Sequence, residues 1–316
     1  MRLDFPLFPE QASTVAGRVD ALYLFLVAVS VVFSSLIFML VGYFAVKYRR
    51  RSDAEWPRPI LGDLRLELLW TIVPLGITLV MFVWGASLYF TMSRPPAEAL
   101  EISVVAKQWM WKFQHPGGQR EINALHVPMG RPVKLTMTSE DVIHSFFVPA
   151  FRVKMDVLPG RYTSMWFQAT KAGDYHSFCA EYCGTQHSGM LGRVIVLVPA
   201  QYERWLSAAA VGESPAAAGA RLFQQLGCQS CHRADSGEKG PALDGLFGRS
   251  VRLQSGATVF ADEAYLRESI FDPNAKIVAG YRQVMPTFRG QISEEGLFQI
   301  IAHIKSLAKE ETAKAR

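Results

Sequence analysis

The chain has 316 residues, of which 50% are hydrophobic and only 19% are charged, and its formal net charge at pH 7 is +5. This length allows two or three domains. The basic residues form no run interleaved with aromatic side chains, so nucleic acid is not expected as a partner. The apolar excess is concentrated in two places, which excludes an ordinary soluble protein.

Two runs of 26 residues without any charge, 21–46 and 68–93, predict transmembrane helices. Each is longer than the about 20 residues that a helix needs to cross a bilayer core. A cleavable signal peptide is not expected, because the first run is too long, no basic segment precedes it and a basic cluster follows it. The loop 47–67 holds six Lys and Arg residues, so the positive-inside rule predicts a cytoplasmic loop with both chain ends outside.

Residues 97–206 change character, with short stretches rich in β-branched and aromatic residues between Pro and Gly turns. These stretches are 101–106, 133–138, 142–148, 164–167 and 194–198. Short strands at regular spacing predict a β-sandwich or a β-barrel.

Small residues at 207–218 predict a flexible linker. Helical patterns follow at 217–226, 262–270 and 293–307, and the last has apolar side chains at helical spacing behind a Ser293 cap. We therefore expect residues 219–316 to form a small helical domain.

Soft and borderline metal donors gather in C-A-E-Y-C-G-T-Q-H-S-G-M, with a histidine upstream in a predicted strand: His144, Cys179, Glu181, Cys183, His187 and Met190. Sulfur and imidazole donors suit copper, whereas magnesium prefers oxygen. The four-residue step between the cysteines is unusual for zinc. Two thiolates this close can bridge two metal ions, and copper thiolate sites move single electrons. The pattern favours electron transfer over hydrolysis, the alternatives being a disulfide or inert buried thiols.

A second motif, C-Q-S-C-H, predicts covalent attachment of a c-type haem, with Cys228 and Cys231 on the vinyl groups and His232 on the iron. The competing interpretation is a thioredoxin-like CxxC, which needs a βαβ setting that these helical flanks do not provide. Both motifs together use all four cysteines, so no structural disulfide is expected.

A six-coordinate haem needs a second axial ligand. Met285 is the only methionine after the first motif and is the expected ligand, and His303 on the terminal helix is its competitor. The Gly240-Pro241 step can present a carbonyl to His232 and so orient its ring.

The order of two spans, a β-domain with H-S-F-F-V-P and the C-A-E-Y-C-G-T-Q-H-S-G-M segment resembles subunit II of haem-copper cytochrome c oxidases. The C-terminal extension resembles the variety with a fused cytochrome c domain. The resemblance implies a multidomain membrane protein: a tail with a two-helix transmembrane hairpin at 1–96, a cupredoxin-like Greek-key β-barrel at 97–206, the linker, and an all-α cytochrome c domain.

The resemblance also implies a dinuclear copper A centre. Cys179 and Cys183 would be its bridging thiolates, His144 and His187 its terminal imidazoles, and Met190 a weak axial ligand.

Three further roles follow only from the resemblance. Glu181 would bind copper through its backbone carbonyl and help to hold a magnesium ion at the interface with subunit I through its side chain. Trp109, in Q-W-M-W-K-F, would admit electrons to the copper, although Trp109 and Trp111 alternate along a strand and could both be core residues. Glu67 occupies the position of a glutamate at the mouth of a proton pathway, but is otherwise an ordinary interfacial residue.

The implied function is electron entry into a proton-pumping oxidase, from the fused haem to copper A and on to the haem of subunit I, where oxygen is reduced. Basic residues outnumber acidic ones in 97–206, so we expect no acidic surface that docks a soluble cytochrome c, and the tethered haem is the expected donor. No catalytic acid, base or nucleophile is expected in this chain.

The implied partners are subunit I, other oxidase subunits, membrane lipid and an upstream donor, either a cytochrome c or a quinol-oxidising complex. The implied location is the inner (plasma) membrane of a bacterium, with the metal domains on its periplasmic face. Two alternatives remain, a nitric oxide reductase with a copper A subunit and a free-standing anchored electron carrier. The side chains of Glu67 and Glu181 argue against the free-standing carrier.

Overall fold

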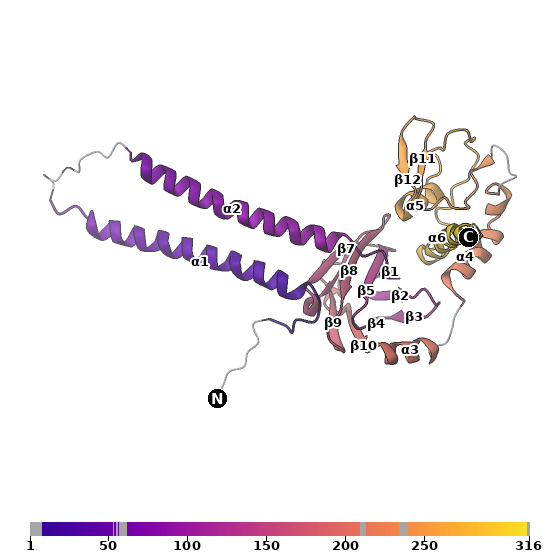
Figure 1. The fold of residues 1–316 in the computed structure, drawn as a ribbon, viewed down its shortest axis with the longest axis horizontal. Coiled ribbons are helices and arrows are strands. Elements are labelled where there is room, and N and C mark those ends of the chain that lie inside the picture. Colours follow the sequence, from indigo (N-terminus) through magenta and orange to yellow (C-terminus); the bar gives the residue numbers. More distant parts are fainter. Residues whose placement is uncertain are drawn as a thin grey trace. The chain divides into compact units, whose positions relative to one another are not determined.

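The computed structural model describes residues 8–52, 54, 56, 62–208, 213–233 and 239–314, with the side chains defined up to residue 307 (Figure 1). The chain divides into two compact units. One unit is Thr14–Arg94, and the other combines Met1–Ser13 with Pro95–Arg316.

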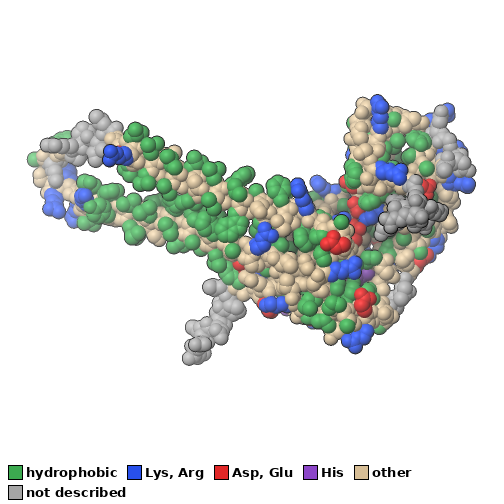
Figure 2. All heavy atoms as spheres, viewed as in Figure 1, with side chains coloured by type: hydrophobic (Ala, Val, Ile, Leu, Met, Phe, Trp, Pro, Cys, Tyr) green, Lys and Arg blue, Asp and Glu red, His purple; other side chains and the backbone are tan. Residues whose placement is uncertain are grey.

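The first unit is a helical hairpin of α1 (Ala16–Lys47) and α2 (Leu64–Ser93). The rings of Phe25 and Trp84 pack across it with centroids 5.5 Å apart, and the Asp63 side chain caps the first turn of α2. Apolar side chains cover the outside of both helices, as Figure 2 shows in green. Both helices are long and apolar enough to cross a membrane, which confirms the two predicted spans.

Two five-stranded sheets form the β-domain in the second unit. The first sheet contains, in spatial order, β3 (Arg120–Ile122), β2 (Met110–Gln114), β1 (Leu100–Lys107), β5 (Pro132–Ser139) and β8 (Thr163–Gln168). The second contains β4 (Ala124–Pro128), β10 (Leu191–Leu197), β9 (Gly173–Cys179), β6 (His144–Val148) and β7 (Val153–Val157), with a 3-10 turn η1 (Pro149–Phe151) after β6.

Neighbouring strands are antiparallel except for the pairs β1/β5 and β4/β10. This mixed pairing requires crossovers between the sheets, as the predicted Greek-key, cupredoxin-like fold does. Large side chains from both sheets fill the core without any solvent exposure, among them Trp111, Leu135 and Phe146. Five strands lie where the sequence predicts strands, and β2, β3, β4, β7 and β9 are additional.

The segment before α1 is attached to the β-domain. The backbone N–H of Ala12 donates to the carbonyl oxygen of Ala150 (3.0 Å), and Ser13 forms a β-bridge with Ala169. The Arg152 guanidinium donates to the carbonyl oxygen of Pro9 at 2.8 Å. Residues 9–13 therefore pack on the β-domain before the chain enters α1.

The C-terminal region is helical, as predicted. Its elements, after α3 (Pro199–Ala208) at the end of the β-domain, are α4 (Pro215–Gln225), η3 (Cys228–Ser230), the small hairpin β11 (Ser250–Arg252) and β12 (Thr258–Phe260), α5 (Glu263–Phe271) and α6 (Glu294–Lys314). Helix α4 crosses α6 at Gly219, where an added Cβ would lie 1.9 Å from the backbone oxygen of Gln299. Glycine is needed there because only a bare backbone allows the two helices to approach so closely. The predicted linker overlaps α3 and α4 at its two ends.

Candidate metal centre and haem site

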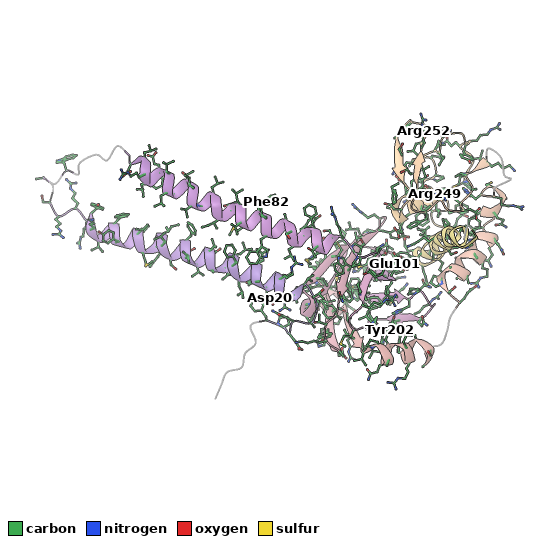
Figure 3. The ribbon with its side chains drawn as sticks, in the orientation of Figure 1. Asp20, Phe82, Glu101, Tyr202, Arg249 and Arg252 are labelled. Carbon is green, nitrogen blue, oxygen red and sulfur yellow. The ribbon has the colours of Figure 1, made fainter. Side chains whose placement is uncertain are left out.

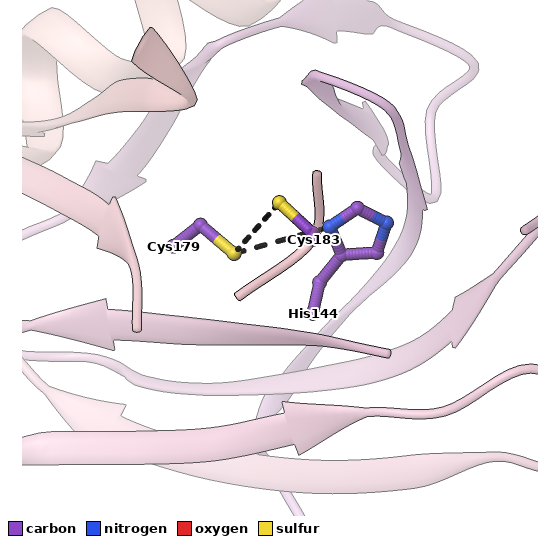
Figure 4. A group of neighbouring side chains, drawn as sticks. All are labelled: His144, Cys179 and Cys183. Carbon is purple, nitrogen blue, oxygen red and sulfur yellow. Dashed lines mark hydrogen bonds between the residues drawn. The ribbon is translucent and has the colours of Figure 1, made fainter. Parts of the chain in front are cut away.

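The donors predicted from the sequence converge at one end of the β-sandwich. His144 begins β6, Cys179 ends β9, and the other donors lie between β9 and β10, where His187 begins the short 3-10 turn η2 (His187–Gly189). The Sγ atoms of Cys179 and Cys183 are 3.7 Å apart. Figure 4 shows these thiols with the His144 ring, whose Nδ1 lies 3.9 Å from Cys179 Sγ.

The remaining donors complete the cluster. The Cys183 Sγ lies 3.5 Å from His187 Nδ1 and 3.8 Å from Met190 Sδ. The backbone oxygen of Glu181 lies 3.2 Å from Cys179 Sγ. All four cysteines are free, and the thiol separation is far longer than the about 2.05 Å of a disulfide. The donors of sulfur, imidazole and carbonyl type therefore gather around the two cysteine sulfurs, each within 3.9 Å of one of them, and this set suits copper.

The cluster is sealed on one side and open on the other. His144 and Met190 are fully buried and Cys183 is 2% exposed, whereas His187 is half-buried and Glu181 is exposed. Burial acts to raise the pKa of Cys179, but His144 and neighbouring backbone groups outweigh it and lower the pKa to about 6. Burial and the Cys179 sulfur raise the pKa of Cys183. Without metal the two thiols therefore share one proton, which a metal ion must displace.

Sequence reasoning missed a network that orients these donors. The Asp141 carboxylate accepts hydrogen bonds from His144 Nε2 (2.8 Å) and from the backbone N–H of Gln108 (2.7 Å). Burial opposes ionisation of Asp141, but these bonds outweigh it and lower its pKa. With an anionic acceptor at Nε2, the proton stays on that nitrogen and Nδ1 faces the thiols with its lone pair. The only sign of this network in the sequence is a carboxylate, Asp141, three residues before His144.

The Gln108-Trp109 step extends this network to the cysteine loop. Gln108 Nε2 and Trp109 Nε1 both donate to the backbone oxygen of Cys183, at 2.8 and 3.1 Å. Trp111 is fully buried and packs edge-on against His144 and Phe146. The structure therefore separates the two tryptophans: Trp109 contacts the donor loop, and Trp111 is a core residue.

The C-x-x-C-H motif borders a largely apolar cavity in the helical domain. Cys228, His232 and Met285 are among its lining residues, and the other walls come from α4, α5, α6 and the irregular segments 239–246 and 273–292. Cys231 is partly exposed beside Ser230 at the end of η3.

The His232 ring is oriented as predicted. Its Nδ1 donates to the backbone oxygen of Pro241 at 2.9 Å, which leaves Nε2 unprotonated. Burial lowers the pKa of His232, with a smaller opposing effect of that hydrogen bond, so the ring is kept neutral, as an iron ligand requires. His303 packs against Phe223 and is absent from the cavity lining, so the residues described in this domain favour Met285 as the axial ligand.

Glu67 belongs to a different compact unit from the two sites. It is exposed in the first turn of α2, in the helical unit. Within the described residues no feature around it tests the predicted role at a proton pathway.

Two apolar helices, a β-sandwich with a sulfur and imidazole site, and a helical domain with a C-x-x-C-H cavity together define a membrane-anchored electron-transfer protein. Three family models match successive regions: the transmembrane domain of cytochrome C oxidase subunit II at 3–88, its periplasmic domain at 119–198, and cytochrome c at 216–308.

Named relatives agree with these matches. Cytochrome c oxidase subunit 2 of Alkalihalophilus pseudofirmus is 30% identical over 294 residues, which cover 88% of this chain and 83% of the relative. That of Thermostichus vulcanus is 29% identical over 253 residues, or 63% of this chain and 77% of the relative. The crystal structure of the periplasmic domain of subunit II of cytochrome oxidase (CoxB) of Bradyrhizobium japonicum is 31% identical, covers 37% of this chain and 96% of its own, and gives a TM-score of 0.36.

The chain belongs to the cytochrome c oxidase subunit II family and carries a fused C-terminal cytochrome c domain. It is therefore a subunit of a haem-copper terminal oxidase, an oxidoreductase. The expected family and the expected fold class are confirmed.

Proposed function

We propose that this chain receives electrons on a covalent haem c, passes them to a dinuclear copper A centre and delivers them to the haem of subunit I, in a proton-pumping oxidase. The observation that carries this proposal is the convergence of six donor atoms, with contacts to the cysteine sulfurs of 3.2–3.9 Å, at one end of the sandwich. A zinc site would need fewer donors, and a hydrolytic site would need a positioned acid, base or nucleophile.

The chain's residues would hold the copper in a fixed arrangement. Cys179 and Cys183 would supply the thiolates, and His144 and His187 the imidazoles. Met190 would be a weak ligand, and the backbone oxygen of Glu181 would complete the set. The bound pair supplies reversible one-electron chemistry. Burial of His144 and Met190 excludes water, and rigid strand ends limit movement of the donors when the charge changes.

Three further residues have supporting roles. The exposed side chain of Glu181 is free to help bind magnesium against subunit I. Trp109 is the electron-entry residue, since its indole N–H contacts the Cys183 backbone. Glu67 marks the mouth of a proton pathway at the start of α2.

The thiols of Cys228 and Cys231 would attach the haem covalently, and His232 and Met285 would bind its iron. The Pro241 carbonyl holds the His232 ring, and Met285 lies in the wall of the same cavity. A His/Met pair raises the potential of a c-type haem.

The chain crosses the bacterial plasma membrane twice, with its metal domains on the periplasmic face. The hydrogen bonds of Ala12 to the β-domain support this, because the segments before α1 and after α2 must then lie on one side. The basic loop between the helices favours the cytoplasm for the other side. The partners are subunit I, the remaining oxidase subunits, lipid, and an upstream cytochrome c or quinol-oxidising complex.

Metal analysis with absorption and paramagnetic resonance spectra of the purified oxidase tests this function. We expect two copper ions per chain, a mixed-valence signal from the pair and a low-spin c-type haem. Zinc or no metal at the cysteines, or a disulfide between them, would contradict the proposal.

The electron order is tested by Met285→Leu. Loss of the thioether removes the axial ligand, so reduction of the copper pair by the upstream donor should slow by at least about tenfold. Stopped-flow absorbance of both centres measures this. Val284→Leu is the matched control, because Val284 is the exposed neighbour at 51%. Copper reduction at an unchanged rate in Met285→Leu would show that electrons reach copper without passing through the haem.

A further inference from the structure

The haem domain and the β-domain meet through a group of charged side chains. Lys305 on α6 places its Nζ 2.7 Å from Glu101 on β1 and 2.8 Å from Glu263 at the start of α5. Lys134 on β5 lies 2.9 Å from Glu101 and 3.7 Å from Glu263. Figure 3 labels Glu101 on the sheet beside the helical domain. The four charges alternate in sign, so each has two opposite neighbours.

Two of the four charged residues already pair within the β-domain, because Glu101 and Lys134 are direct partners in the parallel β1/β5 register. All four side chains are 19–33% exposed. Burial acts to raise the pKa of Glu101, but Lys305 and Lys134 outweigh it and lower the pKa to about 2. Burial acts to lower the pKa of Lys305, and Glu101 and Glu263 outweigh it and raise that pKa. Partial burial makes this network stronger than isolated surface pairs.

An aromatic contact lies beside the charges. Tyr162, just before β8, stacks on Phe298 of α6 with ring centroids 4.7 Å apart and planes at 20°. The Arg267 guanidinium lies 5.1 Å from the centre of the Tyr162 ring. Its Nη1 and Nη2 atoms both donate to the Glu294 carboxylate. Phe298 is 6% exposed, and Tyr162 also packs against the cluster of buried apolar side chains in the haem domain. The β-domain therefore covers apolar surface of the haem domain.

Helix α6 uses two different faces. One face, with Leu297, Ile301 and Ile304, is 0–3% exposed in the core of the haem domain. The other presents Phe298 and Lys305, seven residues and two helical turns apart, to the β-domain. A further ion pair, Arg120 to Glu295 at 3.0 Å, extends this contact. Among the described residues, those lining the haem cavity all belong to the haem domain, so this contact leaves the cavity walls intact.

We propose that the haem domain is seated on the outer face of the β1/β5/β8 sheet in one orientation, with Tyr162 and Phe298 as the anchor and the Glu101, Lys134, Glu263 and Lys305 charges fixing the register. The covalent connection keeps the effective concentration of the domain high, so a small interface is enough to hold it. The cytochrome therefore works as a docked relay and not as a carrier that swings between partners. The role of this docking in electron flow rests on the proposed function, but the docked position of the haem domain does not.

Zero-length carbodiimide cross-linking of the purified oxidase, with mass spectrometry, tests the seat. Amide formation between Glu101 and Lys305 reports contact between the domains, and amide formation between Glu263 and Lys305 is an internal reference within the haem domain. In Tyr162→Ala and Phe298→Ala the ratio of the first product to the second should fall about tenfold, because the buried aromatic pair is lost. Phe260→Ala is the control, since Phe260 is 59% exposed on β12.

The haem and copper spectra of the same samples identify any variant that fails to fold. The unmodified oxidase provides a second measurement, because its ratio should fall as salt is raised from 0.1 to 1 M and the screening length shortens from about 10 to about 3 Å. An unchanged ratio in both variants, or comparable coupling of Lys305 to distant carboxylates such as Asp174, would overturn the seat. An intact seat with no electron transfer from haem to copper would instead contradict the proposed function.

Discussion

The two candidate redox sites of this chain differ in how far their binding residues are preorganised. At the copper-type site the donor atoms already contact one another at 3.2–3.9 Å, at strand ends held by hydrogen bonds. The candidate haem site is an apolar cavity in which Cys228, His232 and Met285 occupy the wall. An ion-sized ligand gains its geometry from fixed donors. A macrocycle needs an open, apolar space and is then secured by covalent bonds.

The scaffolds differ accordingly. Two donors of the copper-type site, His144 and Cys179, lie on neighbouring antiparallel strands, β6 and β9. The haem motif lies on the short turn η3, and Met285 lies in an irregular segment between α5 and α6. Substitutions should therefore act on one site at a time. The following variants test whether the two sites respond independently.

Cys183→Ser should have the largest effect. It removes the thiol that contacts the other cysteine, His187 and Met190, so the two-copper signal should be lost completely while the haem spectrum stays unchanged. Cys231→Ser is the matched change at the other site and should alter haem attachment while the copper signal persists. Paramagnetic resonance and pyridine haemochrome spectra measure both. Loss of both centres in either variant would show that the sites are not independent.

Glu121→Gln should have the next largest effect, on stability. Glu121 accepts hydrogen bonds from the buried His115 (2.8 Å) and from the backbone N–H of His126 (3.0 Å). Burial acts to raise the pKa of Glu121, but the two histidines outweigh it and lower the pKa to about 2. A lowered pKa stabilises the folded state at pH values above the ordinary glutamate pKa of 4.5, and this contribution, about 3 kcal/mol, is lost as the pH falls from about 4.5 toward 2.

Calorimetry of the purified chain between pH 7 and pH 3 measures this. The β-domain transition of Glu121→Gln should be lower at pH 7 and depend less on pH, while the haem-domain transition is unaffected. Glu203→Gln is the control, because Glu203 is exposed on α3. Equal stability of Glu121→Gln and the unmodified chain at pH 7 would contradict the assigned contribution.

Asp141→Asn should have the smallest effect of the three. The amide no longer holds the proton on His144 Nε2, so copper affinity should fall by about tenfold and the copper hyperfine pattern should change. Competition with a copper chelator and paramagnetic resonance measure these effects. Glu140→Gln is the matched control, because Glu140 pairs with Lys107 and Lys112 instead of a donor histidine. An Asp141→Asn spectrum identical to that of the unmodified protein would show that Asp141 does not position His144.

Sequence reasoning found the elements with strong local patterns and missed those without them. The charge-free spans, the strand near 133–138 and the helix starting near Ser293 have clear periodicity. Strand β9 was missed, because G-D-Y-H-S-F-C points polar side chains outward and looks like a loop. This strand carries Cys179, and its pairing with β6 brings that cysteine to His144, 35 residues away.

The amino-acid sequence by itself predicted the two membrane spans, the candidate copper-type donors and the haem-attachment motif, because these depend on residue type and short spacing. Only the tertiary structure decided that Asp141 and Gln108 support the donor loop, that Trp109 and not Trp111 contacts it, and that Tyr162 meets Phe298. These partners lie far apart in the chain. Strand pairing and helix packing bring them together, and no local pattern of residues encodes such distant contacts.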